Sequence, residues 1–154
     1  MLIDFMRGLT YSVNLIVTSD KDGNPHGATI SSLISLNVSP QKEELLLVLK
    51  KTSHTIAMLR GNSLFAISLL NRNQSDVAKH FSMSREIINS HEHLIQSRFE
   101  QKIVYFAINS AAELVCRFTK QHIHDESVIV IANVLQTKIN DLDNVLTYSQ
   151  RTYN

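Results

Sequence analysis

The sequence contains little of what several classes of protein require. It has one cysteine among 154 residues, Cys116, which excludes an internal disulfide and suits a reducing compartment, where we expect Cys116 to be a small buried hydrophobe. Fifteen basic residues stand against 14 acidic ones, so no global field recruits nucleic acid or an anionic membrane. No stretch reaches the roughly 18 to 20 apolar residues of a membrane span. We therefore expect a cytoplasmic protein that binds neither nucleic acid nor membrane.

Other features of composition and order are also missing. Tryptophan is absent and only 6% of the residues are aromatic, so the aromatic side chains are expected in a core and not as stacking platforms for bases. The apolar N-terminal stretch is interrupted by Asp4 and Arg7, which argues against a secretory signal. There is no internal repeat, linker or low-complexity tract. With 44% apolar and 19% charged residues, the chain is expected to form one globular domain over residues 1–154.

What is present is a series of short β patterns. The pattern predicts strands over 9–18, 26–40, 44–51 and 63–71, and a closing antiparallel pair over 108–124 and 127–139. Helices are expected over 52–61, capped by Thr52 or Ser53, and over 71–82, capped by Asn73 or Ser75. Residues 83–104 could form a helix or an ordered excursion, and we assign them as helix. About six antiparallel strands with two or three short helices favour a small, mainly β barrel over a doubly wound sheet.

The strand expected over 26–40, "HGATISSLISLNVSP", is unusually rich in hydroxyl groups. With a period of two, one face would carry Leu33 together with small polar side chains, namely Thr29, Ser31, Ser35, Asn37 and Ser39. The other face would carry mostly aliphatic side chains and could join a core. The polar face should then either meet water or bind a polar ligand.

A second polar segment, "LKKTSHT" at 49–55, places two lysines and three hydroxyl groups directly before an expected helix. Unpaired amides at a helix start, joined by hydroxyl groups and lysine, suit a phosphate group. The alternative is an ordinary helix cap flanked by solvated lysines. Pairing of the strands in one sheet could bring this segment beside the hydroxyl-rich strand, so that both face one cleft.

Several segments, taken in order and with their spacing, resemble one known family, the flavin reductase-like domains. The "G-x-T-x-S-S" strand and the "NRNQSDVAKHFS" helix carry most of this resemblance. The matching segments are "DGNPHGATISSLISLNVSP", "LLLVLKKTSHT", "LFAISLLNRNQSDVAKHFS", "AELVCRF", "SVIVIANV" and "VLTYSQRTY". They extend through nearly the whole chain.

The resemblance implies a split β-barrel homodimer that binds FMN or FAD near the subunit boundary and reduces it with NADH or NADPH. It also implies a separate flavin-dependent monooxygenase as the partner that receives the reduced flavin. The implied cofactor-binding residues lie on one strand, on the lysine turn and at a helix end: Thr29, Ile30, Ser31, Ser32, Lys50, Lys51, Ser53, Thr55, Phe81 and Ser82. No catalytic side chain is assigned, because flavin N5 itself accepts the hydride. The choices between FMN and FAD and between NADH and NADPH stay open.

One departure from the family leads to an alternative function. Many members carry Gly-Asp-His before the penultimate strand, where this chain has Asp125, Glu126 and Ser127. His122 and His124 just upstream could substitute, or could be solvated. The alternative is therefore a flavin-binding carrier of the same fold without efficient NAD(P)H oxidation, and a related enzyme with another substrate is a third possibility.

The "HEH" at 91–93 lacks the H-E-x-x-H spacing and favours a polar surface turn, so no metal is expected.

Overall fold

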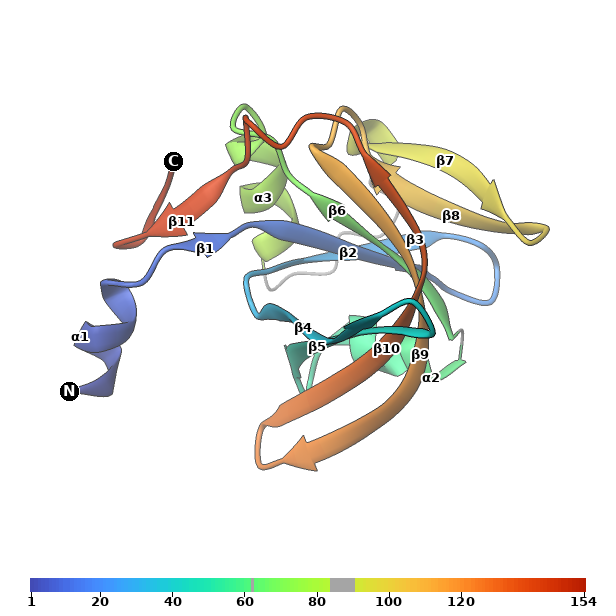
Figure 1. Cartoon of the computed structure of the whole chain (residues 1–154), viewed down its shortest axis with the longest axis horizontal. Helices are drawn as coiled ribbons and strands as arrows, with labels where there is room; N and C mark the ends of the chain where they lie inside the picture. Colours follow the sequence, from blue (N-terminus) through green and yellow to red (C-terminus); the bar gives the residue numbers. More distant parts are fainter. Residues whose placement is uncertain (62, 84–90) are drawn as a thin grey trace.

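The computed structural model describes residues 1–61, 63–83 and 91–154. Within them the chain is mainly β, with twelve strands, three short α-helices and one 3₁₀ turn (Figure 1). In chain order the elements are α1 (Leu2–Arg7), β1 (Tyr11–Ser12), β2 (Asn14–Ser19), β3 (Pro25–Ile30), β4 (Leu33–Ser39), β5 (Lys42–Lys50), α2 (His54–Gly61), β6 (Leu64–Leu69), α3 (Ser75–Ser82), η1 (His91–His93), β7 (Leu94–Phe99), β8 (Lys102–Ala107), β9 (Ala112–His124), β10 (Ser127–Ile139), β11 (Thr147–Ser149) and β12 (Thr152–Tyr153).

Seven antiparallel strands form the main sheet, in the order β3-β2-β6-β9-β10-β5-β4. The two edge strands, β3 and β4, are consecutive in the chain and are joined only by Ser31 and Ser32. Three Cα steps span at most about 11 Å, so the two edges of the sheet must come close together and the sheet must curl. This confirms the expected split-barrel architecture. The six strands beyond the expected six are β1, one strand from the division of 26–40 into β3 and β4, and the two hairpins β7–β8 and β11–β12.

The single strand expected over 26–40 is wrong, because the chain leaves one edge of the sheet at Ile30 and joins the other edge at Leu33. Ser32 lies opposite Val48 of β5, where its side-chain hydroxyl takes the place of a backbone hydrogen-bond partner. Its hydroxyl donates to the Val48 carbonyl oxygen at 2.8 Å and accepts from the Val48 N–H at 3.1 Å. The period-two face therefore does not run through this segment, since the two halves belong to opposite edges.

The buried side chains fill the barrel and a second layer outside it. The interior includes Ile16, Leu47 and Phe65, each at most 1% exposed. Strand β2 is buried along its whole length because its alternate residues, such as Leu15, pack into an outer cluster under α3. Cys116 lies in the interior, as expected, and burial raises the pKa of its thiol to about 12.

The two helices expected at 52–61 and 71–82 are confirmed as α2 and α3, but the cap of the second differs. Ser53 precedes α2, and its hydroxyl accepts from the Thr55 N–H at 3.2 Å. Residue Gln74, and neither Asn73 nor Ser75, occupies the cap position of α3, without a side-chain cap bond. Its buried amide instead accepts from the Asn71 N–H and donates to the Ile108 carbonyl oxygen. The polar group that could have capped the helix therefore ties two loops together.

The helix assigned to 83–104 is wrong where the structure can test it, because β7 and β8 form a hairpin over Leu94–Ala107. The turn between them places Glu100 and Gln101 at φ values of 47° and 66°. Such left-handed turn positions usually carry glycine or asparagine, so Glu100 and Gln101 do not indicate a turn. Residues 84–90 of the expected helix lie outside the described residues.

The helices are short, and α1 stands apart from the barrel (Figure 1). It spans six residues and buries none of them. Among the residues that the structure describes, no helix has both the length and the apolar character that crossing a membrane requires.

Replacing Ser32 with alanine should destabilise the barrel closure. The change leaves the Val48 N–H and carbonyl without their partner, which costs about 1–3 kcal/mol in the free energy of unfolding. The matched control is Ser31→Ala, whose exposed side chain should change that free energy by less than about 0.5 kcal/mol. Urea unfolding followed by circular dichroism measures both. Equal stability of the two variants would show that Ser32 does not close the sheet.

Candidate functional site

The end of β3 lies against α3. The Thr29 hydroxyl donates to the Ala78 carbonyl oxygen at 2.7 Å, so this hydroxyl joins strand to helix. On the same strand, a Cβ added to Gly27 would lie 2.7 Å and 2.9 Å from ring atoms of Phe81. The absence of a side chain at Gly27 thus allows the Phe81 ring to pack on β3. The structure thus brings the strand that carries Thr29 and the end of the helix that carries Phe81 together.

Four of the predicted cofactor-binding residues, Thr29 to Ser32, lie at the end of β3 and in its connection to β4. One of them has an exposed hydroxyl group. Ile30 is buried in the barrel interior and could meet a ligand only through its backbone. The hydroxyls of Thr29 and Ser32 already bond within the fold, whereas the Ser31 side chain is exposed. Among the polar groups farther along β4, the Asn37 amide is also used, since it donates to Glu44 at 2.7 Å. Thr29 and Ser32 therefore stabilise the fold, and Ser31 is the exposed member of the four residues predicted to bind the cofactor here. Ser35, farther along β4, is exposed as well.

The lysine turn follows β5 immediately, next to this connection. Lys50 and Lys51 are exposed. The turn is held by the Ser53 N–H, which donates to the Lys50 carbonyl oxygen at 2.9 Å, and by the Lys51 N–H, which donates to the Glu126 carbonyl oxygen at 2.8 Å. Since Ser32 bonds to Val48 two residues before Lys50, the two predicted segments lie side by side on the barrel.

The start of α2 has fewer groups available to bind a phosphate than the sequence pattern suggested. The Thr55 side chain is buried, and its N–H is bonded to Ser53. The exposed side chains of the turn are the two lysines and Thr52, with Ser53 half-buried behind them. Exposed cations suit the binding of a phosphate group.

The end of α3 contacts an aromatic pair that the sequence pattern did not single out. Phe81 is buried, and Ser82 donates to the Lys79 carbonyl oxygen at 2.8 Å. Tyr148 and Tyr153 of the C-terminal hairpin pack on the same cluster as Phe81, with their ring centroids 5.0 Å apart. Burial raises the pKa of the Tyr153 phenol, and a hydrogen bond with the Ser82 side chain acts against this. The two tyrosines in "TYSQRTY" were the available sign of a strand pair. The turn residues between them, Gln150 and Arg151, are not of the types that usually indicate a turn.

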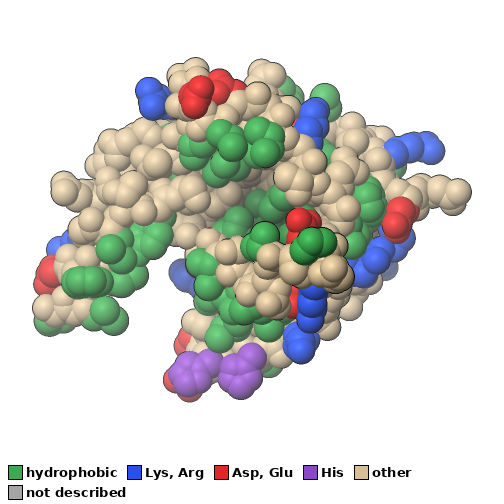
Figure 2. All heavy atoms as spheres, in the orientation of Figure 1, with side chains coloured by type: hydrophobic (Ala, Val, Ile, Leu, Met, Phe, Trp, Pro, Cys, Tyr) green, Lys and Arg blue, Asp and Glu red, His purple; other side chains and the backbone are tan. Residues whose placement is uncertain are grey.

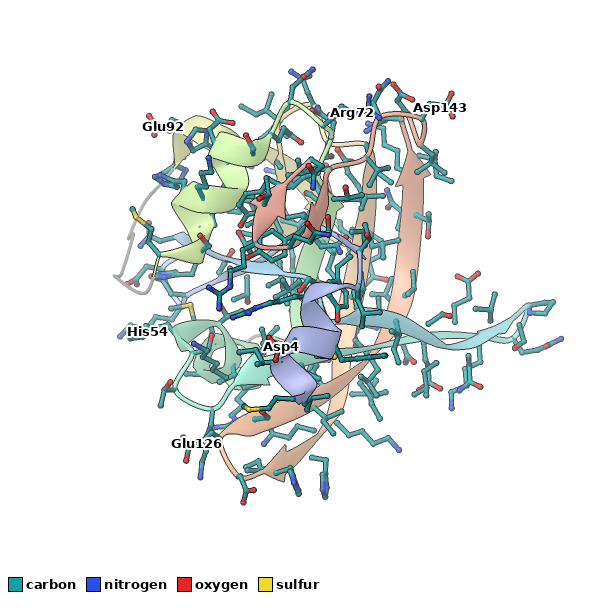
Figure 3. All side chains as sticks on the ribbon, turned by 90° about the vertical axis from the view of Figure 1, so that its left-hand side faces the viewer. Asp4, His54, Arg72, Glu92, Glu126 and Asp143 are labelled. Carbon is teal, nitrogen blue, oxygen red and sulfur yellow. The ribbon has the colours of Figure 1, made fainter. Side chains whose placement is uncertain are left out.

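The segment that departs from the family's Gly-Asp-His lies beside the lysine turn. Asp125 and Glu126 form the turn between β9 and β10, with Asp125 at a φ of 50°. Figure 3 shows Glu126 and His54, at the start of α2, on the same side of the barrel. His122 and His124 are exposed on the preceding strand.

Among the described residues, Ser31, Lys50 and Lys51 form an exposed surface. Three cavities lie elsewhere in the described part of the chain and contain none of the predicted cofactor residues: a groove of about 360 Å³ beside β4 and β5, a hollow of about 660 Å³ beside β8 and the start of β9, and one of about 450 Å³ between the end of α1 and the β11–β12 turn.

The comparison with known families agrees with this arrangement. A family described as "Flavin reductase like domain" matches residues 6–154. The chain belongs to the flavin reductase-like family. The match includes both segments that form the open surface and the C-terminal hairpin.

Individual relatives of this flavin reductase-like chain are distant. The actinorhodin polyketide dimerase of Streptomyces coelicolor is 32% identical over 82 residues, which are 53% of this chain and 45% of that protein, so the chain spans about half the length of this curated relative. The NADH:FAD oxidoreductase of Streptomyces globisporus is 18% identical with a TM-score of 0.85, over 99% of this chain and 90% of that one. The styrene monooxygenase flavin reductase of Pseudomonas putida S12 is 16% identical with a TM-score of 0.85, over 99% and 95%. At these identities the solved structures show the fold alone.

Proposed function

We propose that the protein is an NAD(P)H-dependent flavin reductase that transfers hydride from NADH or NADPH to FMN or FAD. Membership of the flavin reductase-like family supports this, and the Streptomyces globisporus oxidoreductase has been solved in complex with NAD and FAD fragments. The observation that carries the proposal is the position of Ser31 and the lysine turn, which lie side by side on one open face.

The residues of this chain would bind and orient the flavin. Bound flavin supplies the hydride-accepting chemistry, so the protein needs no acid or base of its own. Lys50 and Lys51 would hold the phosphate, and the β3–β4 connection, with Ser31 and the backbone of Ile30, would border the planar ring. Phe81 and Thr29 would fix the wall beside it, because each packs or bonds across β3 and α3. Orientation of two planar rings is the main contribution that hydride transfer asks of a protein.

The reduced flavin would pass to a separate flavin-dependent monooxygenase. An open surface suits a flavin that enters, is reduced and leaves. Among proteins with this fold are the flavin reductases of a styrene monooxygenase and of a bacterial two-component tryptophan halogenase. A reducing compartment such as the cytoplasm supplies the nicotinamide donor, and we propose that location.

A homodimer is the second part of the proposal, because the described residues leave large apolar side chains exposed. Helix α1 exposes Phe5 to 69%, and edge strand β4 exposes Val38 to 78%. Figure 2 shows a hollow between α1 and the barrel with hydrophobic side chains on both of its sides. A second copy that packs against these faces would bury them and cover the flavin.

A flavin carrier is the alternative, and one observation favours it. Asp125 and Glu126 place two acidic side chains beside the lysine turn, where many family members carry Gly-Asp-His. Negative charge at this position would oppose the binding of a nicotinamide nucleotide, which is itself anionic.

The purified protein should oxidise NADH or NADPH when FMN or FAD is supplied, with a kcat on the order of 10 s⁻¹. Loss of nicotinamide absorbance measures turnover, and quenching of flavin fluorescence measures binding separately. Tight flavin binding without oxidation of either nicotinamide would leave the carrier as the function. Failure to bind any flavin would eliminate both.

The variant Lys51→Ala should weaken the binding of FMN more than that of riboflavin, which lacks the phosphate. Loss of one charge-assisted contact at an exposed site costs about 1 kcal/mol, or roughly fivefold in the Kd for FMN, while the Kd for riboflavin should change less than about twofold. Fluorescence titration measures both constants. Lys102→Ala, which removes an exposed lysine from the β7–β8 hairpin, is the control and should change neither. An equal loss for both ligands in Lys51→Ala would place the phosphate elsewhere.

Sedimentation should give twice the chain mass of 17.4 kDa. Phe5→Asp, which charges an exposed residue of α1, should shift the protein toward the monomer because a buried charge without a partner is costly. The control is Ile139→Asp, at an exposed apolar position at the end of β10. A monomeric wild type that binds flavin tightly would contradict a site covered by a second copy.

A further inference from the structure

Three side chains with metal-binding atoms lie close together near the end of α3. One of them, Glu92, is labelled in Figure 3. His80 comes from the last turn of α3, and Glu92 and His93 come from η1, twelve residues later. One ligand atom from each lies within 4.8 Å of the other two. The His80 and His93 rings have centroids 4.8 Å apart at an interplanar angle of 65°, so neither ring stacks on the other.

We propose that His80, Glu92 and His93 bind a divalent transition-metal ion, with Zn²⁺ as the ion that this set of ligands suits best. Two imidazoles and one carboxylate are a ligand set that zinc accepts, with metal–ligand distances of about 2.1 Å. Tetrahedral ligands at that distance are about 3.4 Å apart. Glu92 Oε1 and His93 Nε2 already have this separation, at 3.4 Å. One ligand atom of each residue lies within 4.8 Å of the other two, so side-chain rotation can bring the three ligands to this spacing.

The ion pair between Glu92 and His93 gives little reason of its own for placing the two side chains together. The Glu92 side chain is 73% exposed, and an exposed ion pair with His93 adds little stability. A cation between the three groups would take one lone pair from each of them. Three protein ligands also leave a coordination position for water.

The position of the cluster gives the ion a structural role. It would connect the last turn of α3 to η1, and so to β7. His80 also contacts Phe81, with ring centroids 5.0 Å apart. The ion would therefore fix the end of the helix that packs on Gly27, without taking part in hydride transfer. The proposal stands independently of the flavin assignment, because all three ligands lie outside the predicted cofactor residues.

The test is direct titration of the EDTA-treated, flavin-free full chain with Zn²⁺ in a calorimeter. One saturable site per chain is expected, and a hundredfold excess over Kd should raise the Tm by roughly 5–10 °C. Substituting Co²⁺ should give the intense visible bands of a tetrahedral nitrogen and oxygen site. His80→Ala and His93→Ala should each weaken binding by at least tenfold, because even partners outside the ligand set matter by about 10–100-fold.

Two further variants keep the result interpretable. Glu92→Gln changes only an exposed side chain, so it should fold normally and still lose affinity. His124→Ala removes an exposed histidine whose Nε2 lies 3.8 Å from Asp125, a similar pair elsewhere on the surface, and should bind Zn²⁺ like the wild type. Absence of saturable binding in the wild type would overturn the proposal. Unchanged affinity in His80→Ala, His93→Ala and Glu92→Gln would also overturn it, since the metal would then be held elsewhere.

Discussion

The two-residue connection between the edges of the main sheet is the constraint on which the rest of the structure depends. β3 and β4 lie at opposite ends of a seven-stranded order but are separated by Ser31 and Ser32 alone. A connection this short can be made only if the sheet curls until its edges meet. The Ser32 hydroxyl completes the closure because it bonds to both backbone groups of Val48. A residue with a longer or apolar side chain could not replace these bonds in the same space.

Closure also creates the candidate site. Because Ser32 is fixed opposite Val48, Ser31 must lie near the end of β5, where Lys50 and Lys51 follow within three residues. The register of the strands alone thus places the Ser31 hydroxyl near the two lysine side chains. The same geometry explains why the hydroxyls of Thr29 and Ser32 are unavailable to a ligand: the barrel uses Ser32 where its edges meet and Thr29 where α3 packs.

The sequence allowed those parts of the fold to be predicted in which many side chains repeat one signal. The long apolar patterns of β5, β6 and β10 and the two helices α2 and α3 were found within a few residues. The β7–β8 hairpin was missed because Glu100 and Gln101 adopt left-handed conformations without the residues that usually reveal them. The break at Ser31 was missed because an alternating pattern continues across it. At the candidate site, residue types indicated which groups could bind a phosphate, but only the fold showed that Thr55 is buried and that Ser32 is already bonded.

Helix α3 contacts strand β3 and the C-terminal hairpin. Its carbonyl at Ala78 accepts from Thr29, its Phe81 ring fills the space that Gly27 leaves open, and Ser82 contacts Tyr153. One short helix of eight residues therefore positions a strand edge, an aromatic wall and the C-terminal hairpin. A helix of this length has little stability of its own, so tertiary contacts must hold it. Any interaction that fixes its last turn, such as a cation at His80, would act on the wall of the open face through packing alone, without contact with a flavin.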